Sequence, residues 1–224
     1  MKRIIIGITF LMASVGLFAG EAWNNHLGFG WRMPTSLTMH NETKDYENLK
    51  MSVQTGLNLS YTGVLMSNGF SVRAIIDECF TTSNLDIRDP DSKISSFPGF
   101  NTDVLVGAGW APVRNKNLFF GFYGMLGCDV SAFYYDTDNY WPSDSEAHRT
   151  QRVYYASFLP AVNATFVWTP TGDHFSLFAT ATVGYSCPTA IFYEYDDGNG
   201  NKKTSSITRG GTKVIPAVGM SWRF

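Results

Sequence analysis

The residue types most often used for catalysis are few and scattered in this chain. Its four histidines lie far apart: His26, His40, His148 and His174. His148 has serine and acidic neighbours in residues 143–146. Proximity within a polar segment does not build a nucleophile, a base and a group that orients the base. No glycine-rich phosphate loop and no zinc-type spacing of Cys and His is present. We therefore expect solvated histidines, no catalytic site and no cofactor.

Residues 196–201 are the strongest candidate for metal ligation. Asp196, Asp197, Asn199 and Asn201 bring carboxylate and amide oxygens together with two glycines. A calcium loop would continue with a glutamate, which is missing here, and Asp, Asn and Gly are equally typical of turns. The sequence therefore predicts a turn and no metal site.

The composition argues against a nucleic-acid partner and against disulfides. Lys and Arg total 17 against 19 for Asp and Glu, so there is no basic field to attract phosphates. Three cysteines, Cys79, Cys128 and Cys187, leave at least one unpaired. The alternation described next places them on different faces of strands that are not neighbours, a geometry that disfavours a bridge.

Most of the chain alternates apolar with polar or small residues, which is the period of a β-strand with one apolar face. Eight segments follow this pattern: 23–33, 51–61, 70–79, 100–110, 118–135, 151–168, 175–185 and 214–224. A mean hydropathy of -0.09 fits such a chain, because only alternate residues are apolar. Residues 4–18 form an apolar run that follows Lys2 and Arg3, which predicts a cleaved export signal over residues 1–22, cut after Gly20 or Ala22. No later stretch of the chain contains an apolar run of this length.

The connections between the predicted strands alternate in length. Segments 62–69, 111–117 and 169–174 are short turns, whereas 34–50, 80–99, 136–150 and 186–211 are long and polar. Outward aromatic residues are expected in two belts at the strand ends, with Tyr61 and Trp110 among those beside the short turns. This asymmetry predicts an eight-stranded antiparallel up-and-down transmembrane β-barrel over residues 23–224, with four long extracellular loops. A lipocalin-like barrel or a sandwich is the alternative, and it requires the apolar face to point inward.

The carboxyl-terminal strand carries a resemblance. Its outward face ends in Met220, Trp222 and Phe224. With the eight-strand pattern, this ending resembles the small outer-membrane barrels of the OmpX-like, OmpW-like and OmpA-barrel group. The resemblance implies an assembly signal read by the barrel assembly machinery, outer-membrane lipid as the surrounding partner, a diderm bacterial outer membrane with the loops outside, and a monomer. It transfers function only weakly, because some such barrels are hydrolases and OmpW-like members pass small hydrophobic molecules.

The predicted lumen is charged toward the long loops and apolar toward the short turns. Its expected polar network contains Arg32, Arg73, Asp77, Asp103 and Asp129, and its expected apolar stopper contains Phe119, Val167 and Phe178. Because an eight-stranded barrel is just wide enough for side chains to fill, we expect a salt-bridged plug in preference to an ion path.

The long loops contain aromatic residues suited to contact with a partner: Tyr46, Phe97, Tyr140, Trp141, Phe192, Tyr193 and Tyr195. Exposed aromatic side chains are costly unless they pack together or meet a partner. The leading hypothesis is therefore a non-enzymatic barrel that contacts surface or host partners through these loops, and packing of the same residues as a cap over the barrel is equally compatible. The alternative function is an OmpW-like channel for small hydrophobic molecules.

Overall fold

The computed structural model describes residues 23–40, 49–83, 97–134, 149–170, 174–196 and 202–224. The predicted export signal, residues 1–22, lies outside the described residues and stays a prediction. Within these ranges no helix has the length and apolar character needed to cross a membrane.

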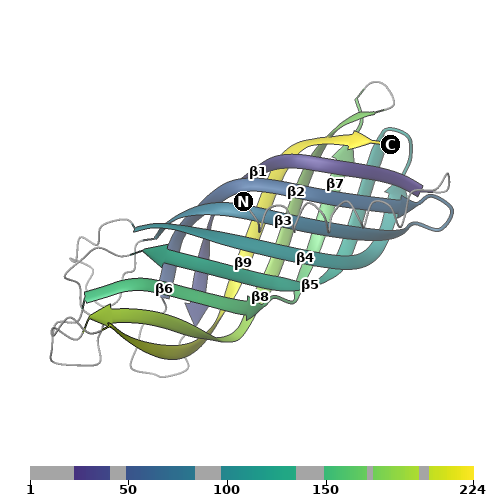
Figure 1. Ribbon diagram of the computed structural model, residues 1–224. Helices are drawn as coiled ribbons and strands as arrows, with labels where there is room; N and C mark the ends of the chain where they lie inside the picture. Colours follow the sequence, from purple (N-terminus) through teal and green to yellow (C-terminus); the bar gives the residue numbers. More distant parts are fainter. Residues whose placement is uncertain (1–22, 41–48, 84–96, 135–148, 171–173, 197–201) are drawn as a thin grey trace.

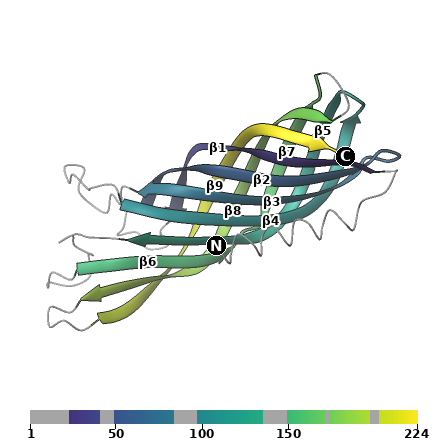
Figure 2. The ribbon, with the colours of Figure 1, turned by 45° about the horizontal axis from the view of Figure 1, so that its top comes forward.

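Antiparallel strands form a closed barrel (Figures 1 and 2). The strands are β1 Trp23–His40, β2 Leu49–Leu65, β3 Phe70–Ser83, β4 Phe97–Arg114, β5 Leu118–Tyr134, β6 Arg149–Phe158, β7 Ala161–Trp168, β8 Phe175–Asp196 and β9 Lys202–Arg223. Consecutive strands pair with each other except β6 with β7, and β9 returns to pair with β1. Both β6 and β7 pair with β5 and with β8, so they are successive halves of one wall strand. The predicted eight-stranded up-and-down barrel is confirmed.

The predicted strand 151–168 is interrupted at Leu159 and Pro160. Proline has no backbone N–H to give to a ladder. On the β8 side, ladder pairing stops before residues 156–160 and 185–190 and resumes at Ala161↔Gly184. The Tyr185 N–H donates to Pro160 O across this interval, at 3.0 Å. We call these two segments the wall seam.

The alternation of faces matches the sequence prediction. On β9, Ile215 and Ala217 are each 1% exposed, whereas the outward Val214 and Val218 are 44% and 40% exposed. The same alternation holds around the barrel: buried charged and polar residues face inward, and large exposed apolar residues face outward. This arrangement contradicts the lipocalin-like or sandwich alternative, which requires apolar residues inside and polar residues outside.

Most of the predicted aromatic belt at the short turns is exposed: Phe70, Trp110, Trp168, Trp222 and Phe224. Tyr61 is the exception, because its side chain is buried. Its hydroxyl donates to Asn25 Oδ1 at 2.8 Å. A Cβ at Gly63 would lie 2.8 Å from the same hydroxyl, so glycine there leaves room for the tyrosine. The expectation that Tyr61 belongs to the exposed belt is therefore wrong.

Two of the short turns are tied together by side chains. Gly69 has a φ of +82°, and a Cβ at this position would lie 2.7 Å from Ala111 O, which favours glycine on both counts. The Arg114 guanidinium donates to Met66 O at 3.0 Å and to Ala111 O at 3.1 Å. The indole of Trp110 donates to the backbone of the same turn. The predicted turns within 62–69 and 111–117 are thus confirmed, with tighter limits than the sequence indicated, whereas residues 171–173 of the third lie outside the described residues.

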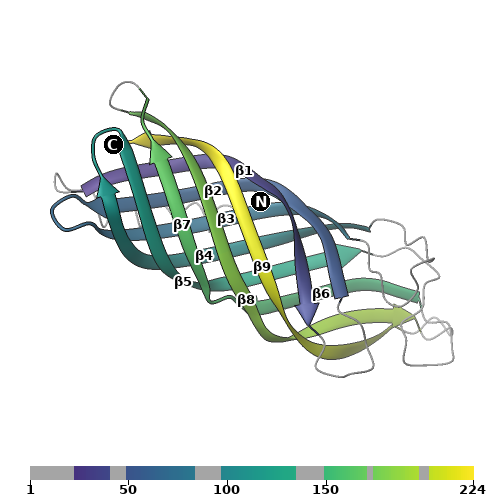
Figure 3. The ribbon, with the colours of Figure 1, turned by 180° about the vertical axis from the view of Figure 1, so that it is seen from behind.

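At the other end of the barrel, the strands extend into segments predicted as loops. Residues 186–211 were expected to be a loop, but β8 continues to Asp196 and pairs there with Lys202 of β9. This hairpin continues past the end of β1 (Figure 3). The period-two apolar signal stops at the edge of the apolar surroundings, whereas backbone pairing does not depend on that signal. The prediction of a loop is therefore wrong for residues 186–196 and 202–211, and residues 197–201 lie outside the described residues.

Candidate functional site

Four charged side chains from four strands meet inside the barrel. Arg32 of β1 and Lys213 of β9 both contact Asp103 of β4, with Nη1 to Oδ2 at 2.6 Å and Nζ to Oδ1 at 2.5 Å. Lys213 Nζ also lies 3.2 Å from Oδ2 of Asp129 on β5. All four side chains are at most 1% exposed. We call Arg32, Asp103, Asp129 and Lys213 the charged layer; it carries two positive and two negative formal charges.

Asn101 connects the members of the charged layer. Its Oδ1 accepts hydrogen bonds from Lys213 Nζ at 2.8 Å and from Arg32 Nη1 at 3.3 Å. Its Nδ2 donates to Ser131 Oγ at 2.8 Å and also to Asp129. The Asn101 amide therefore both accepts and donates hydrogen bonds within the network. Such pairing offsets the cost of burying polar groups in a low dielectric.

The charged layer contains three of the five residues predicted for the polar network. Arg32, Asp103 and Asp129 come together, and the sequence prediction missed Lys213 and Asn101. Both could have been found by extending the alternation, because Lys213 precedes the inward Ile215 by two residues and Asn101 precedes the inward Asp103 by two.

Asp77 and Arg73 lie outside this set of ion pairs. Asp77 Oδ1 accepts a hydrogen bond from Asn58 Nδ2 at 2.6 Å. Arg73 donates to Thr62 and lies over the ring of Tyr123, and within the described residues it forms no ion pair. An ion pair between Arg73 and Asp77, Asp103 or Asp129, which the predicted network allowed, is not present within the described residues. Arg73 lies four residues nearer the short turns than Asp77 on β3, which puts it below the charged layer.

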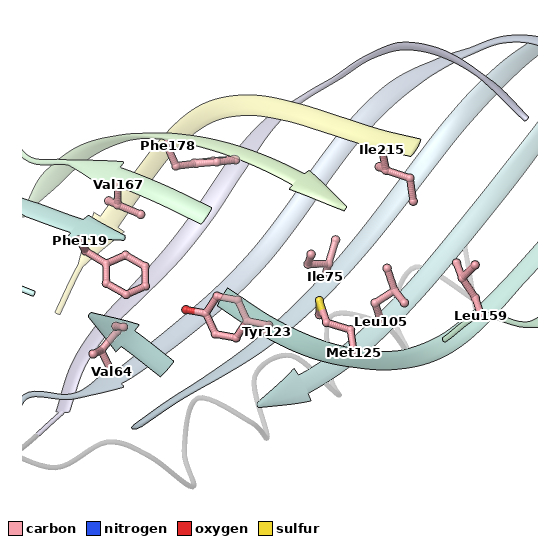
Figure 4. Close-up of a cluster of buried hydrophobic side chains, with 11 residues drawn as sticks. Val64, Ile75, Leu105, Phe119, Tyr123, Met125, Leu159, Val167, Phe178 and Ile215 are labelled. Atoms are coloured by element: carbon pink, nitrogen blue, oxygen red, sulfur yellow. The ribbon is translucent and has the colours of Figure 1, made fainter. Parts of the chain in front are cut away.

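Apolar side chains occupy the lumen on the short-turn side of the charged layer, which we call below it. The predicted stopper residues are adjacent, because Phe119 is opposite Val167 and Val167 is opposite Phe178 in neighbouring strands. All three are buried. They belong to a larger cluster, which Figure 4 shows with Tyr123 between its two ends; its further labelled members are Val64, Ile75, Leu105, Met125, Leu159 and Ile215. The apolar region is therefore longer than the stopper that the sequence predicted.

A neutral hydrogen-bond network occupies the wall beside this cluster. Asn163 Nδ2 donates to the hydroxyls of Thr180 and Thr182, each at 2.7 Å. Thr165 donates to Asn163 Oδ1 at 2.7 Å. These residues are buried, so side chains fill this part of the lumen as expected for a barrel of this size.

The described histidine side chains do not form a catalytic arrangement. His26 is buried in the lumen, where neither ring nitrogen has a hydrogen-bond partner within the described residues. His174 Nδ1 lies 2.9 Å from a backbone oxygen, Arg223 O, and its ring stacks on Trp222 with centroids 5.2 Å apart. In the same part of the chain, no group of three or more His, Cys, Asp or Glu is placed to hold a metal ion. The three cysteines are free.

The predicted partner-contacting residues fall mainly outside the described side chains. Tyr46, Tyr140 and Trp141 lie outside the described residues. The backbone of Phe97 begins β4, and Phe192, Tyr193 and Tyr195 lie on β8, so these four are strand residues, contrary to the prediction of loops. At the other end of the chain, Met220, Trp222 and Phe224 are exposed on the outward face.

Comparison with solved structures defines the class of fold. A major outer membrane protein from Thermus thermophilus aligns with a TM-score of 0.59 at 12% identity, covering 91% of this chain and 100% of that one. OprG from Pseudomonas aeruginosa aligns at 0.47 and 12% identity over 90% and 95% of the two chains. The outer membrane protease OmpT from Escherichia coli aligns at 0.45 and 10% identity over 92% and 98%. No family model and no curated protein matches the sequence. The chain has the fold of the small eight-stranded outer-membrane β-barrels, and similarity at this level establishes the fold alone.

Proposed function

We propose that this chain is a non-enzymatic protein of the outer membrane of a diderm bacterium, and that its long-connection end contacts partners outside the cell. In this proposal the exposed apolar band lies in lipid, the barrel is a monomer, and the terminal strand is read by the barrel assembly machinery. The charged layer keeps the lumen closed to ions, because its four side chains are almost fully buried.

The observation that carries this proposal is the projecting β8–β9 hairpin. Pairing of β9 with β1 ends at His40↔Gly210, whereas pairing of β9 with β8 continues to Asp196↔Lys202. In the described residues, 202–209 therefore pair on one side only. Such a strand edge accepts an extended peptide through backbone hydrogen bonds. We propose an extended segment of a surface or host protein as the partner of this edge.

Site-specific photo-cross-linking in intact cells tests the edge. A photoreactive residue at Thr204 or Ser206 should give one discrete protein adduct, and the same residue at Ala181, on the outward face within the barrel, should give none. An additional Thr208→Pro substitution removes one backbone N–H on the side of β9 that faces away from β8, so it should reduce the adduct while leaving the barrel folded. Identical cross-linking from Thr204 and Ala181 would rule out a partner at this edge.

A second candidate function is an OmpW-like route for small hydrophobic molecules. It is favoured by the apolar lumen below the charged layer and by the wall seam, where two neighbouring strands lose ladder pairing. Liposomes containing the purified barrel should then take up a small apolar solute faster than empty liposomes, and Phe178→Trp should slow the uptake. Uptake equal to that of empty liposomes would leave the surface-contact proposal alone.

A further inference from the structure

The guanidinium of Arg73 is a buried cation with unused donors. The residue is 3% exposed. One nitrogen donates to Thr62 Oγ1, and the guanidinium carbon lies 5.9 Å from the centroid of the Tyr123 ring. Nε and Nη2 have no hydrogen-bond acceptor within the described residues. Stacking on an aromatic face uses the plane of the guanidinium and leaves its N–H edge free to bind an acceptor.

Other unused polar atoms face the lumen at the same level. His26 is opposite Thr62 in the β1–β2 ladder, and Thr62 is opposite Arg73 in the β2–β3 ladder. Ser221 of β9 is opposite Gly28, the next inward residue of β1. Both ring nitrogens of His26 and the hydroxyl of Ser221 are buried without a partner within the described residues. Four adjacent strands thus bring hydrogen-bond donors to this level.

The acidic residues of the lumen are engaged elsewhere. Asp103 and Asp129 belong to the charged layer. Asp77 Oδ1 accepts a hydrogen bond from Asn58, and Ile75 faces inward between Asp77 and Arg73 on the same strand. The negative charge of Asp77 acts on Arg73 without an ion pair between them among the described residues, and Asp77 Oδ2 has no hydrogen-bond partner there. A buried cation without a contacting acceptor for its N–H groups is destabilising, so this edge of the guanidinium favours an anion.

We propose that Arg73, His26 and Ser221 form a binding site for a small carboxylate. The planar Nε and Nη2 edge of arginine matches the two oxygens of a carboxylate. An imidazole N–H and the serine hydroxyl supply the further donors. The surroundings favour a carboxylate with a short apolar group, because Phe119 stacks on His26 with centroids 6.3 Å apart and Phe178 lies beside Gly28. This site is independent of any partner at the β8–β9 edge.

Nuclear magnetic resonance of the purified barrel in detergent micelles tests the proposal, with sodium butyrate as the probe. The Arg73 Nε–H resonance should shift saturably with butyrate, and the same titration should raise the Tm of the wild type. Arg73→Gln should abolish the rise in Tm. His26→Phe, which keeps an aromatic ring against Phe119 but removes its N–H donor, should weaken binding at least tenfold. Arg114→Gln, which removes a positive charge outside the lumen, should bind like the wild type.

A crystal structure with 4-bromobenzoate, whose aryl bromide does not alkylate cysteine or histidine, decides the matter even if the Arg73 variant does not fold. The expected result is an anomalous bromine peak within the lumen, with the carboxylate on the Arg73 guanidinium. Ordered water at Nε and Nη2 in its place, together with no saturable shift in the butyrate titration, would overturn the proposal. Bromine only at the barrel surface would indicate an adventitious additive only and would overturn it as well.

Discussion

Replacing Lys213 by methionine should destabilise the barrel more than replacing Arg32, the other cation of the charged layer. Methionine fills similar volume but removes the contacts of 2.5 Å and 3.2 Å to Asp103 and Asp129. Asp103 keeps Arg32 at 2.6 Å, so the loss of the lysine's charge is felt mainly by Asp129. Breaking a buried pair by removing one partner costs about 3 to 5 kcal/mol, and we expect a loss in this range.

A double-mutant cycle tests the physical cause of that loss. Asp129→Asn in the Lys213→Met background restores equal numbers of positive and negative charges in the layer, so the double variant should recover at least about 1 kcal/mol of the free energy of unfolding. Urea titration of the barrel in lipid vesicles measures each corner of the cycle. Lys116→Met, at an exposed turn residue, is the matched control and should stay within about 0.5 kcal/mol of the wild type. The assignment of the charged layer as an ion-paired plug would be refuted if Lys213→Met lost as little free energy of unfolding as Lys116→Met. It would also be refuted if the effects of Lys213→Met and Asp129→Asn were strictly additive.

Three further predictions concern the wall and the carboxyl terminus. Val106→Arg on the outward face should cost about 2 to 4 kcal/mol in a vesicle folding titration, whereas the inward Thr182→Asn should cost far less; equal losses would mean that the faces are assigned wrongly. Gly109→Ala should reduce the folded fraction, because its Cβ would lie 1.8 Å from the backbone of β5, whereas Gly124→Ala meets nothing within 4 Å and should fold like the wild type. Phe224→Ser should lower the yield of folded barrel in cells while export is unchanged, as measured by heat-modifiable gel mobility of membrane fractions; an unchanged yield would remove Phe224 from the assembly signal.

The faces of the strands could be predicted from the sequence because, within the exposed apolar band of the barrel, successive residues alternate between the inward and the outward face. Alternation alone places Asp103 and Asp129 inside and Val106 outside. The pairing of the charges could not be predicted, because it depends on how far each strand is displaced along its neighbour. That displacement brings Lys213 to Asp103 across 110 residues of sequence and leaves Arg73 below the charged layer.

The ends of the strands were harder to predict for a different reason. Residues 190–193 of β8 are apolar or aromatic in succession, and residues 202–209 of β9 are mostly polar. These segments keep pairing although neither shows a period-two signal. The interruption between β6 and β7 could be predicted, because Pro160 lies within the segment 151–168 and proline is disfavoured in the interior of a ladder.

The wall seam has a consequence for how the barrel opens. Above it, β6 is held to β8 through the ladder from Arg149↔Asp196 to Tyr155↔Ile191, and below it β7 is held to β8 through an unbroken ladder from Ala161 to Trp168. On the β5 side the register is continuous from β6 to β7, and Leu159 N–H donates to Gly127 O between them. On the β8 side the ladder is divided, so its upper part can separate from β8 while the lower part stays paired. We therefore expect two cooperative units on this side of the molecule, with amide hydrogens of β6 exchanging with solvent orders of magnitude faster than those of β7.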